Sequence, residues 1–322
     1  MWEIDPHLNS ATPRSRTDDY AQSSIEKLQS LLELCLEKQY DTVVFLGDVF
    51  HRPTQPLSYM YSVIRQLNKF KQNGVELLSI VGNSHDITYD KLEYLPKSAL
   101  GVLFEIGVVK ELQSETFTTV EGYNITLNGF HYPQTLEPVE TRPVVSEVNI
   151  CVCHRPYNQS LYHDTLTSEL IESLGYNIYA CGHDHIPYEL EKYNSKLIVR
   201  PGRFMRGSSD NYNKEGTLVY ADVVSFNGSK DNPRITYTRE IIKSLPASSI
   251  FNTNSLTKTK SDKYLQDLSA KVELLLDKMD ISSTSESSVY DVLDSLDIDT
   301  RIKNRLETYL NSKGIFRTNI EL

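Results

Sequence analysis

The sequence predicts an α/β protein built in layers, and two observations indicate this class. Short, continuous apolar runs occur at residues 42–46 and 76–81, and such runs are typical of strands that are buried on both faces. Around these runs, residues 18–39 and 57–73 carry apolar side chains on one face at the spacing of a helix. Strands that alternate with helices at this spacing form a sheet with helices packed against it.

The individual elements follow from the same patterns. The helix expected at residues 18–39 has Ile25, Leu28 and Leu32 on one face. The helix expected at 57–73 ends before Gly74, and glycine is frequent just after a helix. From residue 117 to 130 the pattern changes to short alternating strands around a glycine turn. Further strands are expected at residues 149–153, 178–181, 196–199, 217–224 and 234–242.

Composition divides the chain into a large first domain, residues 1–245, and two shorter parts. Residues 246–261 are rich in Ser, Thr and Asn, which predicts a linker. Residues 262–322 contain three helical segments, one of which places Ile302, Leu306 and Leu310 along a single face. We therefore expect a small helical region after the linker.

The charge balance excludes a general basic surface for nucleic acid. The 322 residues include 33 basic and 43 acidic side chains, a net charge of −10, so any contact with DNA requires local positive charge, bound metal or a partner. No apolar run approaches the roughly 18 residues that a membrane span needs. Residues 1–5 have neither the basic nor the apolar part of a secretory signal, so we expect a cytoplasmic protein with no membrane contact.

Histidines are concentrated at the ends of the predicted strands. Six of the eight follow predicted strands, most of them in short motifs that also contain Gly, Asp or Asn, and they are His7, His51, His85, His154, His183 and His185. Ligands of open α/β sheets bind at the carboxyl ends of strands. A single histidine at such a position is more often structural, but five separate motifs of this kind are hard to obtain by chance.

This mixture of residues fits a pair of metal ions. Two divalent cations about 3.5–4 Å apart need a bridging carboxylate, and together they can clamp a phosphoryl group and activate a water. Carboxylate, amide and imidazole groups together suit Mn²⁺, Fe²⁺ or Zn²⁺ better than Mg²⁺ or Ca²⁺. We expect two Mn²⁺ ions, with Fe²⁺ and Zn²⁺ as alternatives.

The motifs, in this order, resemble the calcineurin-like metallophosphoesterase family over roughly residues 1–245. The resemblance implies a four-layer β-sandwich flanked by helices. Within the family, Gly-Asp-Val-Phe-His at residues 47–51, followed by Arg-Pro, is similar to DNA double-strand-break repair nucleases of the SbcD type. The length and the helical tail are also similar to phage recombination nuclease subunits.

The resemblance implies a role for each motif residue. One metal would be held by Asp5, His7 and His185, the other by Asn83, His154 and His183, and Asp48 would bridge both. His85 corresponds to the histidine that contacts the scissile phosphate, and His51 to the one that orients the phosphate for exonucleolytic cutting. Asp86 and Asp184 are candidates for orienting histidines through Nδ1, with a simple role as turn carboxylates as the equal alternative.

Two departures from the family pattern affect these assignments. The family has the amide ligand and the catalytic histidine adjacent, whereas Ser84 separates Asn83 from His85 here. One added residue in an extended segment reverses the next side chain, unless a bulge absorbs it. Four residues precede Asp5 where the family has a full strand, and Glu3 would fall in that strand.

Arginines are grouped near the metal motifs. Seven lie within about ten residues of a motif or in the Pro-Gly loop, namely Arg14, Arg16, Arg52, Arg155, Arg200, Arg203 and Arg206. Because the arginine fork grips phosphate oxygens, we expect a basic rim around the metals that contacts DNA. The alternative for any single arginine is an ion pair with Asp18, Asp19 or Asp210.

We therefore expect a two-metal phosphodiesterase that acts on DNA as an exonuclease or endonuclease in recombination or repair. By the resemblance, its partner would be an SbcC-like ABC-type ATPase, docked on a helical stripe of Val289, Val292, Leu293 and Leu296. Simple packing of the tail on the first domain is the alternative, and a homodimer stays open. Competing functions are a phosphodiesterase or phosphatase for small or protein substrates, and a catalytically weakened DNA-end scaffold.

Overall fold

In a computed structural model, the structure describes residues 2–4, 6–118, 122–158, 164–185, 191–206, 219–229, 232–245 and 247–251. All of them belong to one compact unit, Met1–Phe251. The rest of the predicted linker and the helical region at 262–322 lie outside the described residues.

The first sheet has six strands in the order β12-β11-β1-β2-β3-β4. Their bounds are β1 Trp2–Ile4, β2 Thr42–Phe45, β3 Glu76–Ser79, β4 Lys110–Glu111, β11 Val219–Ser229 and β12 Asn232–Ile242. The pairs from β1 to β4 are parallel, whereas β11 runs antiparallel to both β1 and β12. The short strand β1 lies between β2 and β11 in this sheet.

The second sheet has the order β5-β6-β7-β8-β10-β9. Its strands are β5 Ser114–Thr118, β6 Asn124–Phe130, β7 Val148–Cys153, β8 Ile178–Cys181, β9 Glu191–Tyr193 and β10 Lys196–Val199. The four strands β6, β7, β8 and β10 run parallel, and β5 and β9 are antiparallel edges. Both sheets are thus mixed.

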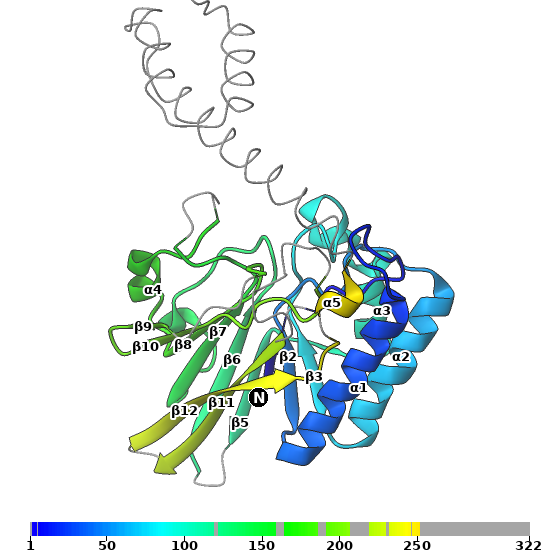
Figure 1. Cartoon of the computed structure of the whole chain (residues 1–322). Helices are drawn as coiled ribbons and strands as arrows, with labels where there is room; N and C mark the ends of the chain where they lie inside the picture. Colours follow the sequence, from blue (N-terminus) through cyan, green and yellow to red (C-terminus); the bar gives the residue numbers. More distant parts are fainter. Residues whose placement is uncertain are drawn as a thin grey trace, which may run out of the picture. The chain divides into compact units, whose positions relative to one another are not determined.

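Helices cover the outer faces of the two sheets. They are α1 Tyr20–Lys38, α2 Leu57–Gln72, α3 Ala99–Glu105, α4 Ser168–Leu174 and α5 Ala247–Ile250, with 3₁₀ turns at Thr88–Asp90, Leu92–Lys97 and Val139–Thr141. Figure 1 shows α1, α2 and α3 beside the first sheet and α4 beside the second. The arrangement is helices, sheet, sheet and helix, so the predicted α/β fold with helix-flanked sheets is confirmed.

Alternation along the strands explains the three parts of the core. In β2, Val43 and Phe45 pack with the helices of the first sheet, while Val44 faces the second sheet. In β7, Ile150 also lies between the sheets, while Cys151 packs toward α4. Because each strand buries both of its faces, its sequence is an unbroken apolar run rather than an alternating one.

The described end of the chain differs from the predicted linker. Residues 247–250 form α5, and Ile250 and Phe251 are buried. Phe251 also makes a β-bridge with Arg16. Two buried apolar side chains attach this segment to the first domain, which therefore extends to Phe251.

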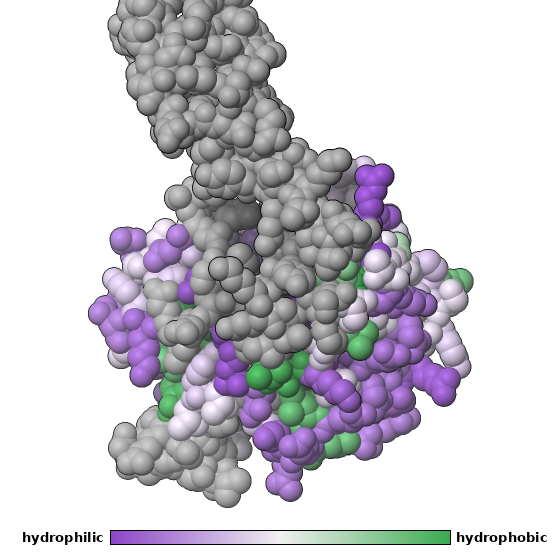
Figure 2. Space-filling model, viewed as in Figure 1, coloured by the Kyte–Doolittle hydropathy of each residue, from purple (hydrophilic) through white to green (hydrophobic). Residues whose placement is uncertain are grey.

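The surface of the described part is mostly polar in the view of Figure 2, where hydrophobic residues gather in a few patches. Among the described residues, no helix has the length and apolar character that crossing a membrane requires.

Candidate metal centre

Side chains from both sheets meet where parallel strands end. In the first sheet, β1, β2 and β3 are followed by His7, Asp48 and Asn83. In the second sheet, β7 and β8 are followed by His154 and His183. The candidate metal centre consists of these side chains and one more, namely His7, Asp48, Asn83, His154, His183 and His185.

Asp48 is in the middle of this group. Its Oδ2 lies 3.3 Å from Nε2 of His154 and 3.6 Å from Nε2 of His7. Its Oδ1 accepts a hydrogen bond of 3.1 Å from the backbone N–H of Asn83. Ligand atoms of His7, Asp48 and His185 all lie within 4.8 Å of one another. One buried carboxylate therefore faces imidazoles from three loops.

Asn83, His183 and His154 form a second group of side chains in the candidate metal centre. Nδ2 of Asn83 lies 3.1 Å from Nδ1 of His183, and the same His183 atom lies 3.3 Å from Nε2 of His154. The His154 and His183 rings meet edge to face at 5.1 Å. These three side chains therefore converge on one point beside Asp48.

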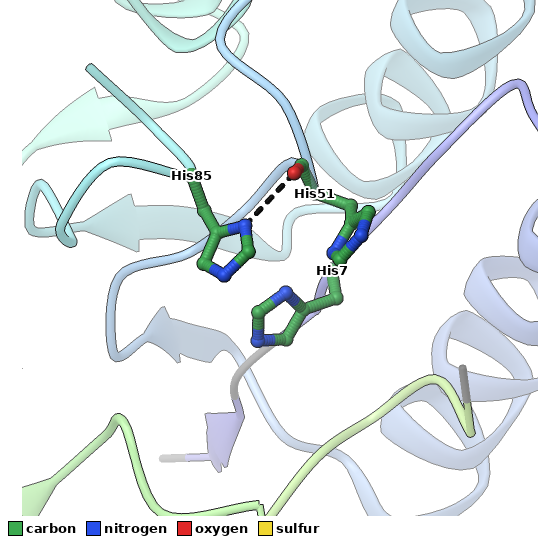
Figure 3. Close-up of side chains that lie close together, drawn as sticks. All are labelled: His7, His51 and His85. Atoms are coloured by element: carbon green, nitrogen blue, oxygen red, sulfur yellow. Dashed lines mark hydrogen bonds between the residues drawn. The ribbon is translucent and has the colours of Figure 1, made fainter. Parts of the chain in front are cut away.

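His51 and His85 stand next to the centre and contact its residue His7. Figure 3 shows the three rings together, with a hydrogen bond from His85 to the backbone of His51. Nδ1 of His85 donates to the carbonyl of His51 at 2.8 Å, and the two rings stack at 4.8 Å. The His7 and His85 rings lie 4.9 Å apart. The carbonyl of His51 thus fixes the orientation of the His85 ring.

The donor set fits divalent cations. Nδ1 of His154 donates to the carbonyl of Leu46 at 2.7 Å, so the lone pair of a neutral His154 is on Nε2 and faces Oδ2 of Asp48. No described residue donates a hydrogen bond to this buried oxygen. Two electron-rich atoms this close repel each other unless a cation or proton lies between them. A metal ion would convert the repulsion into two coordinate bonds.

The protonation states also favour metal binding. Burial lowers the pKa of His183 to about 4 and that of His185 to about 3, and it lowers the pKa of His7 well below its ordinary value. Burial alone would raise the pKa of Asp48, but the positive charge of the adjacent His154 in its protonated form holds it below its ordinary value. At neutral pH these groups are neutral imidazoles and a carboxylate, which are the forms that bind metals.

Backbone strain is concentrated at the same residues. His7, Asp48 and His183 have φ values of 47°, 46° and 75°, a left-handed conformation that non-glycine residues seldom adopt. Each such residue costs on the order of 1–3 kcal/mol and persists where the surrounding structure enforces it. Here the strain turns three side chains from their strand ends toward a common point.

Two glycines allow the strand ends to approach closely. A Cβ at Gly82 would lie 2.2 Å from Oδ1 of Asp48. A Cβ at Gly182 would lie 2.2 Å from the carbonyl oxygen of Leu46 and 2.8 Å from Nδ1 of His154. This close approach explains why glycine precedes the site residue in these two motifs.

The additional residue Ser84 is accommodated in a tight turn. The N–H groups of Asp86 and Ile87 both donate to the carbonyl of Asn83, at 3.0 and 3.1 Å, and the N–H of His85 donates to Oδ1 of Asn83 at 3.2 Å. Because the segment is a tight turn and not an extended strand, the side chains of Asn83 and His85 both reach the site. The reversal expected for an extended chain does not occur.

Asp86 has the second of the two roles considered for it, that of a carboxylate which holds a turn. It is fully buried, and its two oxygens accept the N–H groups of Phe50 at 3.2 Å and of Gly82 at 2.8 Å. Burial and the nearby Asp48 raise its pKa to about 7. Asp86 therefore joins two site loops through their backbones and does not orient a histidine. Asp184 is half-buried beside His183.

The arginines do not all form an exposed rim. Arg16 is buried, donates to Asp18 at 2.8 and 2.5 Å, and donates to the carbonyl of Arg206 at 2.7 Å. Arg200 and Arg206 are buried too. Only Arg14 and Arg52, among the described arginines of the predicted group, are exposed.

The two remaining arginines contact protein groups. Arg155 donates to the carbonyl of Gln134 at 2.8 Å and lies 3.7 Å from Asp164. Nη2 of Arg203 lies 2.7 and 3.0 Å from the ring nitrogens of His185, so its cation acts directly on the metal centre. Asp5, the remaining predicted ligand, lies outside the described residues.

His131 is a residue that the sequence analysis did not single out. Its Nδ1 accepts the N–H of Val81 at 3.0 Å, and its Nε2 lies 3.0 Å from Glu111. It thereby supports the strand end that leads into Gly82. The same signal could have identified it, because it directly follows the strand that ends at Phe130.

The family model of calcineurin-like phosphoesterases matches residues 5–187. The DNA double-strand break repair protein Mre11 of Methanopyrus kandleri is 26% identical over 219 residues, which cover 62% of this chain and 47% of that protein. The protein of the same name from Archaeoglobus fulgidus is 21% identical over 211 residues, covering 59% and 46%. The chain spans about half the length of these curated relatives.

Among solved structures, a dimetal phosphatase from Danio rerio is 12% identical, with a TM-score of 0.45. The match covers 76% of this chain and 98% of that one.

Proposed function

We propose that this chain, which belongs to the calcineurin-like phosphoesterase family, is a two-metal phosphodiesterase that cuts DNA. The observation that carries the hydrolytic part is the buried Oδ2 of Asp48, which faces Nε2 of His154 at 3.3 Å and of His7 at 3.6 Å. DNA as substrate is supported by the similarity to the two Mre11 proteins.

The site residues divide between two cation positions that share Asp48. His7 and His185, together with Asp5, would hold one cation, and Asn83, His154 and His183 would hold the other. Bound divalent cations supply charge to clamp a phosphoryl group and to lower the pKa of an attacking water. Mn²⁺ suits the mixed carboxylate, amide and imidazole set.

His85 is the residue we assign to the leaving group. Its Nδ1 proton is held by the carbonyl of His51, which leaves Nε2 to face a substrate. The imidazolium form of His85, which carries a second proton on Nε2, could donate that proton to the departing oxygen and return to the neutral imidazole, a contribution that is typically 10²–10⁴-fold in rate. The stacked His51 ring keeps His85 from rotating and orients the phosphate.

Binding to DNA would rest on a few local charges. The net charge of −10 opposes DNA everywhere except where cations gather. Arg14 and Arg52 are exposed in the loops that follow β1 and β2, and Arg52 adjoins His51. We assign these two arginines to the phosphate backbone beside the scissile bond.

The partner assignment rests on similarity to the nuclease branch of the family. We propose that the chain is the nuclease subunit of a repair or recombination complex with an SbcC-like ATPase. The predicted stripe of Val289, Val292, Leu293 and Leu296 would be the docking helix. Co-purification with and without a deletion of residues 286–298 tests this part.

The activity is tested with purified protein, Mn²⁺, linear duplex DNA and bis-nitrophenyl phosphate, beside the Asp48→Asn variant. We expect the wild type to cut both substrates and Asp48→Asn to cut neither. Cleavage of the ester alone would refute DNA as substrate and favour a phosphoesterase for small or protein substrates. Full activity of Asp48→Asn would refute the two-metal mechanism.

A further inference from the structure

Arg203 places a positive charge directly on one ligand residue of the candidate metal centre. Its Nη2 lies 2.7 Å from Nδ1 and 3.0 Å from Nε2 of His185. A guanidinium has N–H donors and no acceptor, so it donates to whichever ring nitrogen has the lone pair. Contact with DNA does not require this hydrogen bond, which therefore calls for a separate explanation.

A cation held by His7, Asp48 and His185 (the His185 position) needs the same lone pair. Ligand atoms of these three residues lie within 4.8 Å of one another. A neutral imidazole has a single lone pair, and its other nitrogen carries a proton. Once the lone pair binds a metal, the protonated nitrogen cannot accept a hydrogen bond from an arginine. His185 therefore contacts either the guanidinium or a metal ion, but not both.

The charge of Arg203 also opposes a second cation at this place. After burial, Arg203 is the largest cause that lowers the pKa of both His7 and His185. Its positive charge thus acts on two of the three ligand residues. Like charges a few ångströms apart in a partly buried site repel each other strongly. A metal ion on His185 therefore requires the guanidinium to move away, and not merely to lose one hydrogen bond.

The side chain of Arg203 can move while its backbone stays in place. The N–H of Arg203 donates to the carbonyl of His185 at 3.3 Å, and the preceding Gly202 turns the chain with a φ of 80°. The next two residues, Phe204 and Met205, are buried in the core. The residue Arg203 itself is half-buried. Rotation of bonds in the long arginine side chain is therefore enough to release His185.

We propose that Arg203 competes with the metal ion at the His185 position and that the two cation positions therefore fill in sequence. The position formed by Asn83, His154 and His183 (the His154 position) fills at the lower metal concentration, because the guanidinium donates to His185, which is a ligand of the other position. The His185 position fills only when the metal concentration is high enough to displace the guanidinium. The inference rests on the proposed two-cation centre but not on DNA as the substrate.

The test is a calorimetric titration with Mn²⁺ of the full chain, stripped of metal with EDTA and exchanged into EDTA-free buffer. The wild type is compared with Arg203→Met, which removes the charge, and with Arg203→Lys, which keeps a charge but not the planar fork. The control is Arg65→Met, which removes the same charge from an exposed position of α2 outside the candidate metal centre.

We expect two binding steps in the wild type, of which only the weaker one responds to Arg203. A hydrogen bond from a charged donor changes a binding constant by about tenfold or more, so the weaker step should be at least about tenfold tighter in Arg203→Met. Arg203→Lys should lie between the two, and Arg65→Met should match the wild type. A wild type that takes up one Mn²⁺ where Arg203→Met takes up two would be the extreme form of this result.

Two outcomes would overturn the proposal and leave the two-metal centre intact. One is two Mn²⁺ ions per chain with the same two constants in the wild type and in Arg203→Met. The other is a weaker second step in Arg203→Met, because Arg203 would then support the metal. Fewer than two Mn²⁺ ions in the wild type and in every variant would refute the two-metal centre and this inference with it.

A crystal structure of the Mn²⁺-loaded wild type tests the same point without a substitution. We expect a metal ion on His185 and Nη2 of Arg203 beyond hydrogen-bond distance of that ring. A metal ion on His185 with the guanidinium still donating to the same ring would contradict the competition.

Discussion

Asp48 is the residue on which the candidate metal centre depends most. Its two oxygens divide their contacts, with Oδ1 on the backbone of Asn83 and Oδ2 toward His7 and His154. Its own φ of 46° is strained. The strained backbone of Asp48 costs stability in the metal-free protein, and we expect a bound cation to offset this cost.

Replacing Asp48 by Asn tests this view, because the amide keeps the shape and can still accept the N–H of Asn83 but has no charge. Changes in residues that merely support a metal ligand typically cost 10–100-fold in affinity, so we expect loss of a bridging ligand to cost more than about 100-fold in Mn²⁺ affinity. Calorimetric titration measures the loss. Asp41→Asn, at an exposed position, is the matched control and should bind Mn²⁺ normally.

The site histidines should make the metal-free protein sensitive to acid. An unfolded histidine titrates near 6.5, whereas burial lowers the pKa of folded His183 to about 4 and of folded His185 to about 3. Between these pKa values the unfolded chain binds more protons than the folded one. The free energy of unfolding should therefore fall as the pH drops from 6.5 toward 4. Urea unfolding in EDTA at several pH values measures this slope. His185→Gln should have a shallower slope, and an equal slope would contradict the assignment.

At the scale of elements, the site depends on how closely the loops pack after the strands. Asp86 joins the loop after β2 to the loop after β3, and Gly82 lets the second loop pass directly under Asp48. Hydrogen bonds to backbone groups and the close approach at Gly82 thus position the loops. The positions of the loops in turn determine where the side chains of the site lie.

Gly82→Ala should disturb both the fold and the site. The added Cβ would lie 2.2 Å from Oδ1 of Asp48, and overpacking of this kind typically costs about 1–3 kcal/mol. We expect a lower unfolding midpoint together with weakened Mn²⁺ binding. Gly74→Ala is the control, because a Cβ there meets nothing within 4 Å. This variant should lose only about 1–2 kcal/mol of stability, because alanine is strained at the positive φ of this position, and it should bind Mn²⁺ normally.

Deleting Ser84 should reduce activity, even though it restores the spacing of the family. The deletion removes a residue from the turn that Asn83 closes with Asp86 and Ile87, so His85 and the buried Asp86 cannot both keep their places. A misplacement of about 1 Å can cost 10²-fold in rate. Ester hydrolysis measures the effect, and Ser84→Ala, at an exposed position, should be active. Higher activity after the deletion would contradict this interpretation of the turn.

At the scale of the whole molecule, two sheets contribute their strand ends to one centre, while the surface is acidic overall. Under the proposed nuclease function, contact with DNA would come from a few exposed cations and from bound metal. We expect Arg14→Gln and Arg52→Gln each to weaken DNA binding and to reduce the slope of log K against log salt by about 0.9. Arg65→Gln, which changes an exposed arginine of α2, is the control. If neither site arginine changes the slope, DNA does not cross this surface.

Much of the fold could be predicted because buried strands and long helices leave continuous patterns. The run at 42–46 and the helix at 18–39 correspond to β2 and α1 within two residues. Short elements such as α3 and α4 were missed, because seven residues hold too few periodic positions to reveal a helix. The strand-end motifs indicated the candidate metal centre because each of them follows one of these apolar strands.

The parts that could not be predicted depend on contacts between distant segments. Spacing along the chain cannot show that Arg16 donates to Asp18 and to the carbonyl of Arg206, which removes it from the surface. Nor can it show that Asp86 accepts two backbone N–H groups instead of orienting a histidine. The turn at Ser84 depends on hydrogen bonds to Asn83, which a comparison of motif lengths does not contain.

The most direct measurement is a crystal structure of the Mn²⁺-soaked protein with anomalous scattering recorded at the manganese edge. We predict two anomalous peaks about 3.5–4 Å apart, both within bonding distance of Asp48, with His154 and His183 on one and His7 and His185 on the other. A single peak, or peaks that do not share Asp48, would contradict the two-metal site.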